Sequence, residues 1–144
     1  MFNEFFKKTY NKISFEDIQH IINKSKDVFI INTLPNTEQE CLIYKTISYE
    51  TEENTINELL TNYDFTPFFI IYGKNCNDNT VEKKANQLNG LGFSNIYVYS
   101  GGLFEWLLLQ DIYGDDEFKT TKKELDILKF KPQSALSTSL MSLN

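Results

Sequence analysis

A polar loop between residues 73 and 80 carries the residues with the clearest capacity for chemistry. It contains the thiol of Cys76, the ammonium of Lys74 and the carboxylate of Asp78. The loop follows an apolar run and precedes a helical pattern, so its backbone N–H groups can converge on an anion. The same helix dipole, together with Lys74, would favour the thiolate form of a cysteine.

The sequence therefore predicts an anion or ligand site in this loop, with Cys76 as the candidate catalytic residue. The candidate site residues are Gly73, Lys74, Asn75, Cys76, Asn77, Asp78, Asn79 and Thr80. The alternative interpretation is a solvated loop of turn-forming Asn and Asp that contains an incidental cysteine.

Metal and cofactor chemistry find little support in the rest of the chain. The sequence has two cysteines and one histidine, too few for a disulfide framework or a zinc site. Cys41 is expected to be a small buried apolar group, and His20 lies off the apolar stripe of its helix. We therefore expect neither a metal nor a cofactor.

The charge balance excludes several partners. Twenty acidic residues stand against 14 basic ones, a net charge of −6, and every basic residue is lysine. Nucleic acid and anionic membrane surfaces are recognised through basic residues, so neither is an expected partner. Without arginine, the chain lacks the planar guanidinium that grips an oxyanion with two hydrogen bonds.

The elements that position the loop alternate between strand and helix. Continuous apolar runs predict strands over 27–33, 67–72 and 96–99, and a weaker β segment near 41–48. Apolar residues at helical spacing predict helices over 14–24, 50–63, 79–90 and 103–112, with capping signals at Ser14 and Asn79. Short connections between such elements indicate parallel βαβ units and an α/β sheet.

The length of 144 residues suits a single domain. We expect an N-terminal arm over 1–12, a domain over 13–114, a helical extension over 115–131 and a flexible tail over 132–144. Thr121 with Glu124 forms the capping signal of the extension. The charged N-terminus has the pattern of neither a signal peptide nor a membrane anchor, so an intracellular, cytoplasmic location is expected.

A resemblance to a known family rests mainly on residues 91–106. There Leu91-Gly92-Phe93 precedes a short strand, Gly101-Gly102 follows it, and Trp106 stands after three spacer residues. This block resembles rhodanese-like domains, and the resemblance extends from about Ile13 to Trp106. It implies an α/β domain with about five parallel strands flanked by helices. It also implies a cysteine that opens the loop after the fourth strand and carries a persulfide for sulfur transfer.

The loop departs from that family pattern. Placed directly after Tyr72, the family's cysteine falls on Gly73; counted back from Gly92, it falls on Asn75, one residue before Cys76. The loop is therefore about two residues longer than usual. The basic residue expected at its far side is replaced by the segment 78–80.

Two upstream motifs differ as well. The family's Asp-Val-Arg is replaced by Asn32-Thr33-Leu34, and its Gly-His-Ile most nearly aligns with Cys41-Leu42-Ile43. With the Gly73 substitution, the extension resembles a divergent branch of protists and large DNA viruses.

Three functions follow as hypotheses. The first is a non-classical rhodanese-like binding or regulatory module without the usual loop cysteine, which would make it a pseudoenzyme. The alternatives are a sulfurtransferase or persulfide carrier that uses Cys76, and a structural subunit of a larger assembly such as a viral particle. A protein partner is expected to contact the apolar helix Leu103–Ile112 or the tail, where Leu136, Leu140 and Leu143 form a stripe.

Overall fold

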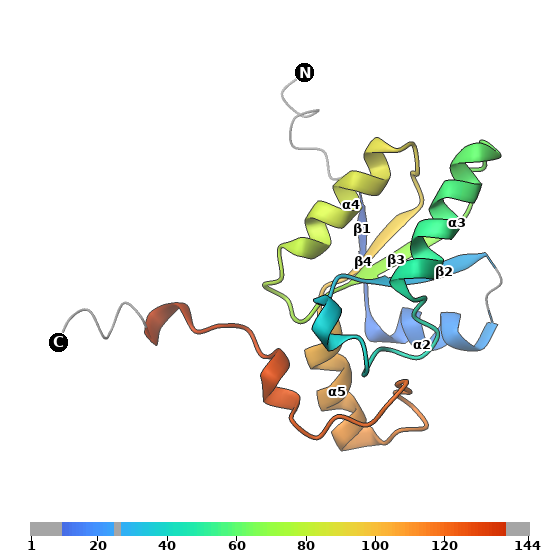
Figure 1. Cartoon of the computed structure of the whole chain (residues 1–144). Helices are drawn as coiled ribbons and strands as arrows, with labels where there is room; N and C mark the ends of the chain where they lie inside the picture. Colours follow the sequence, from blue (N-terminus) through green and yellow to red (C-terminus); the bar gives the residue numbers. More distant parts are fainter. Residues whose placement is uncertain (1–9, 25–26, 138–144) are drawn as a thin grey trace.

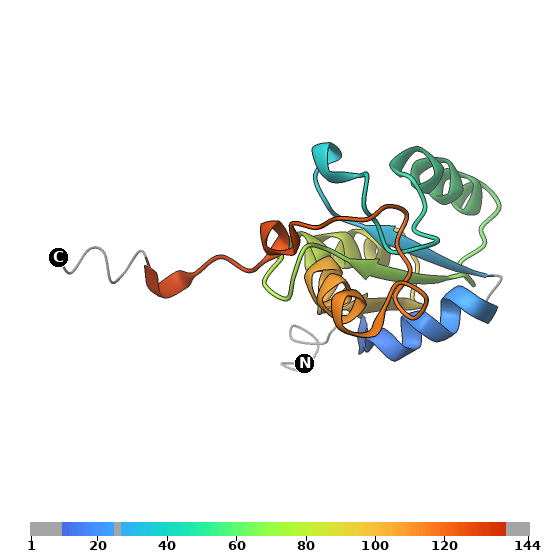
Figure 2. The ribbon, with the colours of Figure 1, turned by 90° about the horizontal axis from the view of Figure 1, so that it is seen from below.

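The protein forms a parallel sheet covered by helices on both faces (Figures 1 and 2). We describe it from a computed structural model, which describes residues 10–24 and 27–137. The elements are β1 (Asn11–Ile13), α2 (Phe15–Lys24), β2 (Val28–Asn32), the 3-10 turn η1 (Asn36–Glu38), α3 (Tyr49–Thr61), β3 (Phe68–Tyr72), α4 (Thr80–Gly90), β4 (Ile96–Tyr99), α5 (Gly102–Tyr113) and the 3-10 turn η2 (Ile127–Phe130). The strand order is β1-β4-β3-β2, and all pairs are parallel.

Two apolar clusters lie on opposite faces of the sheet. Side chains alternate along each strand, so that in β3 Ile70 and Tyr72 join one cluster while Phe69 and Ile71 join the other. Helices α2 and α5 cover the first cluster, and α3 and α4 cover the second. The α/β class and the parallel sheet expected from the sequence are thus confirmed.

The sheet has four strands among the described residues instead of about five. The expected β segment near 41–48 makes one isolated parallel bridge, between Ile30 and Thr46. It cannot continue along β2 because Lys45 has a φ of 71° and turns the chain. Ile43 forms an isolated antiparallel bridge with Thr120 instead.

The first strand begins inside the expected N-terminal arm. Asn11–Ile13 pair in parallel with Tyr97–Tyr99, so the boundary expected at residue 13 falls within β1. This three-residue edge strand carries too short a pattern to be recognised from sequence. Residues 1–9 lie outside the described residues. The capping signal that follows is confirmed, because the Ser14 N–H donates to Asp17 Oδ2 at 2.9 Å.

Residues 115–131, which we call the C-terminal strap, do not form the expected helix. The structure describes this whole stretch, and its helical turn is limited to η2. Thr121 cannot cap a helix because its hydroxyl donates to the Glu40 carbonyl at 2.8 Å and accepts from the Leu42 N–H at 3.0 Å. The strap lies beside α5 in Figures 1 and 2 and covers part of its apolar surface.

Trp106 connects α5 to the strap. Its side chain is fully buried, its indole N–H donates to the Lys119 carbonyl at 3.0 Å, and its ring meets Phe118 edge-on at 5.0 Å between centroids. The strap therefore covers the part of the α5 surface around Trp106. Leu108 and Ile112 on the same helix stay exposed.

After the strap, residues 132–137 run away from the domain (Figures 1 and 2). Leu136 is 70% exposed. Leu140 and Leu143 lie outside the described residues, so docking of the tail on a partner stays a prediction.

The packing of Trp106 predicts a large loss of stability for Trp106→Ala. We expect a decrease of about 3–5 kcal/mol in the free energy of unfolding, because a cavity opens between α5 and the strap. Urea denaturation measures it, and Leu108→Ala, at a 40% exposed position of the same helix, serves as the control. Equal losses in the two variants would contradict the assigned role of Trp106.

The burial of the Tyr72 hydroxyl predicts that the protein becomes less stable at alkaline pH. Its hydroxyl accepts from the Ile43 N–H at 3.0 Å and is hydrogen-bonded to Thr46 Oγ1 at 2.7 Å. Burial raises the pKa of Tyr72 above its ordinary value. The folded state holds the Tyr72 proton more tightly than the unfolded state does. The contribution of this hydroxyl to the free energy of unfolding is therefore complete below about pH 10 and is lost as the pH rises above that value.

Denaturation across this pH range tests the prediction. Tyr72→Phe should cost about 1–3 kcal/mol at neutral pH, since Ile43 loses its acceptor, and should make the alkaline fall shallower. Tyr63→Phe, at an 84% exposed position, should leave both unchanged. A wild-type alkaline limb that persists unchanged in Tyr72→Phe would refute the assignment.

Candidate functional site

The β3–α4 loop (residues 73–80) lies at the carboxyl edge of the sheet, where ligands of parallel α/β folds collect. The first turn of α5 holds it from one side. The Leu103 N–H donates to the Gly73 carbonyl at 2.9 Å and the Phe104 N–H donates to the Lys74 carbonyl at 2.8 Å. Gly102 permits this approach: its φ is +67°, and a Cβ there would lie 2.8 Å from Gly73 O.

The Asp78 carboxylate occupies the centre of the loop. Its Oδ2 accepts from the Lys74 N–H at 2.9 Å, and its Oδ1 accepts from the Thr80 N–H at 3.1 Å and from the Thr80 hydroxyl at 2.5 Å. The expected capping residue Asn79 makes no side-chain hydrogen bond to the helix. Asp78 therefore takes the capping role, and its negative charge fills the backbone cradle that the sequence predicted for an anion.

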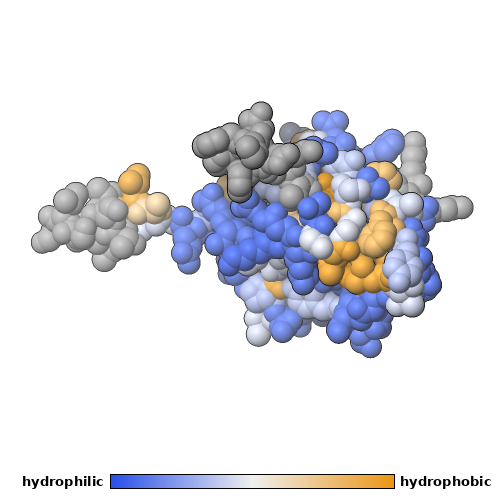
Figure 3. Space-filling view, turned by 90° about the horizontal axis from the view of Figure 1, so that it is seen from above, coloured by the Kyte–Doolittle hydropathy of each residue, from blue (hydrophilic) through white to orange (hydrophobic). Residues whose placement is uncertain are grey.

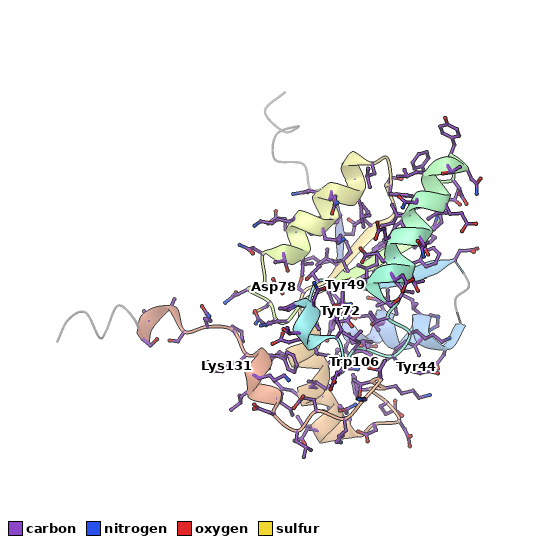
Figure 4. The ribbon with its side chains drawn as sticks, in the orientation of Figure 1. Tyr44, Tyr49, Tyr72, Asp78, Trp106 and Lys131 are labelled. Carbon is purple, nitrogen blue, oxygen red and sulfur yellow. The ribbon has the colours of Figure 1, made fainter. Side chains whose placement is uncertain are left out.

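Gly73 and Asp78 compete for the same space. A Cβ at Gly73 would lie 2.3 Å from Asp78 Oδ2 and 2.7 Å from Val81 Cγ2. A side chain at Gly73 is thus incompatible with the present position of Asp78. Figure 4 shows Asp78 beside Tyr49 and Tyr72 at this edge of the sheet.

The strap supplies groups to the loop that sequence reasoning missed. Asn75 Nδ2 donates to the Phe130 carbonyl at 2.9 Å. Lys129 and Lys131 of the strap line a cavity of about 800 Å³ together with Lys74 and Asp78, and Figure 4 places Lys131 on the strap. Ion pairs occupy two of these lysines: Lys74 with Glu38 at 3.3 Å and Lys129 with Glu124 at 3.1 Å.

Cys76 lies on a different side of the loop. Its side chain is exposed and lines a separate pocket of about 240 Å³ with Lys12 and Glu82. Its Sγ is 3.8 Å from Asn77 Oδ1, a weak contact. The structure thus brings the loop residues together but does not bring Cys76 to the lysine-lined cavity. A catalytic role for Cys76 stays a prediction.

Cys41 is a buried structural residue, as expected. Its Sγ is 3.2 Å from the Lys122 carbonyl of the strap. Burial, reinforced by the nearby Glu124 carboxylate, raises the pKa of this thiol. Cys41 therefore stays protonated at neutral pH and packs as an apolar group.

The segment 32–34 braces the neighbouring turn. Asn32 is fully buried, and its Oδ1 accepts from the Leu34 N–H at 3.0 Å and from Gln39 Nε2 at 2.8 Å. Tyr49 donates to the Leu34 carbonyl. These neutral hydrogen bonds stand where the resemblance would put a charged Asp and Arg. No local pattern predicts these hydrogen bonds, because Gln39 and Tyr49 belong to separate elements.

Three solved structures are similar to this chain. The BH2092 protein of Bacillus halodurans has 20% identity and a TM-score of 0.61, over 96% of each chain. A Saccharomyces cerevisiae homologue of single-domain rhodanese and of a phosphatase catalytic domain has 15% identity and a TM-score of 0.55, over 83% of this chain and 91% of that one. The S. cerevisiae single-domain sulfurtransferase RDL2 has 15% identity and a TM-score of 0.51, over 72% and 94%.

This chain has a rhodanese-like fold. The similarity to solved structures confirms the expected fold. No family model matches the sequence, and no curated protein matches it significantly. The narrower resemblance to a branch of protists and large DNA viruses stays a prediction.

Two further properties of this rhodanese-like chain concern its described residues. Among them, no helix is long and apolar enough to cross a membrane. In the same part of the chain, no group of three or more His, Cys, Asp and Glu side chains is arranged to hold a metal ion.

The position of Asp78 predicts that Asp78→Asn destabilises the loop. An amide NH₂ would face either the Lys74 N–H or the Thr80 N–H, and we expect a loss of about 1–3 kcal/mol in urea denaturation. Asp64 is a matched control because it caps Thr66 in the same way, with its Oδ1 3.1 Å from the Thr66 N–H. Asp64→Asn should cost less. A loss for Asp78→Asn no larger than for Asp64→Asn would show that the bond to Lys74 contributes nothing.

Proposed function

We propose that this protein is a non-catalytic rhodanese-fold binding module. One observation carries the proposal: the Asp78 carboxylate fills the space over Gly73, which is one of the two positions where the resemblance places the sulfur nucleophile. A thiosulfate or persulfide anion entering this cradle would meet a negative charge and find the Lys74 and Thr80 N–H groups already bonded. Repulsion between two negative charges weakens anion binding, and so does the lack of free N–H donors.

The lack of arginine supports the same conclusion. Sulfur transfer from an anionic donor needs preorganised donors aimed at the developing charge. The cavity offers lysines instead, and carboxylates pair with two of them. Lysine is a point charge without the forked geometry of guanidinium. The cavity is thus poorly equipped to orient a sulfur donor.

A protein partner is the ligand that we propose for the module. Helix α5 keeps Leu108 and Ile112 exposed, 40% and 69% respectively, after the strap has covered Trp106. Leu136 of the tail is also exposed. Both features fit the expectation that α5 or the tail contacts a partner.

A second candidate is a persulfide carrier at Cys76. The exposure of its thiol favours it, because a sulfur donor can reach an exposed thiol. This candidate requires sulfur to bind outside the cradle, on the side of the loop that faces Lys12.

Sulfur transfer from thiosulfate to cyanide distinguishes the two candidates. We expect no turnover by the wild type, and no gain of one sulfur atom in its intact mass after incubation with thiosulfate. Gly73→Cys should also be inactive and less stable, because its side chain collides with Asp78. Wild-type turnover or sulfur gain that disappears in Cys76→Ser would establish the carrier. Robust turnover by Gly73→Cys would show that the cradle is intact.

A further inference from the structure

A second concave site lies between α3 and α4, away from the strap. This α3–α4 groove encloses about 660 Å³, a volume typical of small-molecule sites. Its residues Glu52 and Lys84 lie near the first turns of the two helices, and Ile56, Leu60, Leu88 and Leu91 lie farther along them. The groove therefore has one charged end, next to the carboxyl edge of the sheet, and one mainly apolar end, where Asn57 and Gln87 are the polar lining residues.

The apolar end reaches the surface. Leu91 is 39% exposed, and Ile56 and Leu60 are half-buried. Figure 3 shows an apolar patch on the face where, in Figure 1, the C-terminal ends of α3 and α4 lie. An apolar body that enters the groove from this side would remove that surface from water.

The polar end contains one buried acceptor that has no partner among the described residues. Glu52 is 7% exposed; its Oε2 accepts from Lys84 Nζ at 2.7 Å, while its Oε1 is buried and makes no hydrogen bond to any described residue. A buried carboxylate oxygen without a donor is costly. Because Glu52 lines the groove, a ligand there can supply the donor.

Two neutral polar residues at this end are already engaged. Asn32 accepts from Leu34 and Gln39, and the Thr80 hydroxyl is shared between Thr33, at 2.8 Å, and Asp78. Glu53 and Lys83 also line this end, but both are exposed to water. The less exposed Glu52–Lys84 pair is therefore the polar group that a ligand in the groove would contact away from water. Lys84 has three N–H donors and a partly exposed side chain. The pair therefore presents an acceptor next to a donor.

We propose that the α3–α4 groove binds a small molecule that carries a carboxamide or lactam edge on an apolar ring. The N–H of such an edge would donate to Glu52 Oε1, and its carbonyl would accept from Lys84. The ring would lie toward Ile56 and Leu88. A neutral ligand is preferred to a charged one, because Glu52 and Lys84 already neutralise each other. This inference stands whether or not the loop has lost sulfur transfer.

Benzamide is the probe, and N,N-dimethylbenzamide, which has no N–H, is its matched control. Amide spectra of the nitrogen-labelled full chain should show benzamide shifting the signals of Glu52, Lys84 and Leu88. The dimethyl probe should bind at least about tenfold more weakly, the loss expected for one hydrogen bond to a charged group. Equal binding of the two probes would overturn the proposal, as would shifts confined to the β3–α4 loop or absent altogether.

A pair of variants on α3 tests the role of Glu52. Glu52→Gln should weaken benzamide at least about tenfold and remove the difference between the two probes. Glu58→Gln, at an exposed position of the same helix, should leave benzamide binding unchanged. Undiminished binding to a folded Glu52→Gln would overturn the proposal. The comparison of probes on the wild type decides the question even if that variant fails to fold.

Discussion

The attachment of the β3–α4 loop to the first turn of α5 is the constraint on which the site depends. Two N–H groups of α5 are used on the carbonyls of Gly73 and Lys74, so the N-terminus of this helix is closed to external anions. With the carbonyls of the loop fixed toward α5, the Lys74 N–H points to Asp78. A helix end and a backbone cradle, both suited to anions, are thus satisfied by groups of the protein itself.

This arrangement separates the fold from its usual chemistry. Gly102 and Trp106 keep the helix after β4 in place, and both belong to the block that resembles rhodanese-like domains. The altered residues, Gly73 and Asp78, concern only the interior of the loop. The fold can therefore be kept while the interior of the loop differs, as the proposed function requires.

Short sequence patterns predicted the elements whose structure depends on neighbouring residues. Strands β2, β3 and β4 are short apolar runs, and the capping of α2 by Ser14 and Asp17 spans four residues. The strap was mispredicted because Thr121 is bonded to Glu40, 81 residues away. In the loop, sequence could place the polar residues but could not choose Asp78 over Asn79 as the cap. Glu52 carried no signal beyond an acid in the first turn of a helix.

The late position of the strap in the sequence has a consequence for biosynthesis. The ribosome completes β1–β4 and α2–α5, the strands and α-helices of the described residues, before it adds residues 115–131. Until then, the α5 face around Trp106 and the thiol of Cys41 are uncovered, and Gln19 lacks its bond to the Glu117 carbonyl, 98 residues later in the chain. A nascent chain paused at this point would expose an apolar surface that chaperones and proteases can bind, and packing of the strap on α5 would remove that surface.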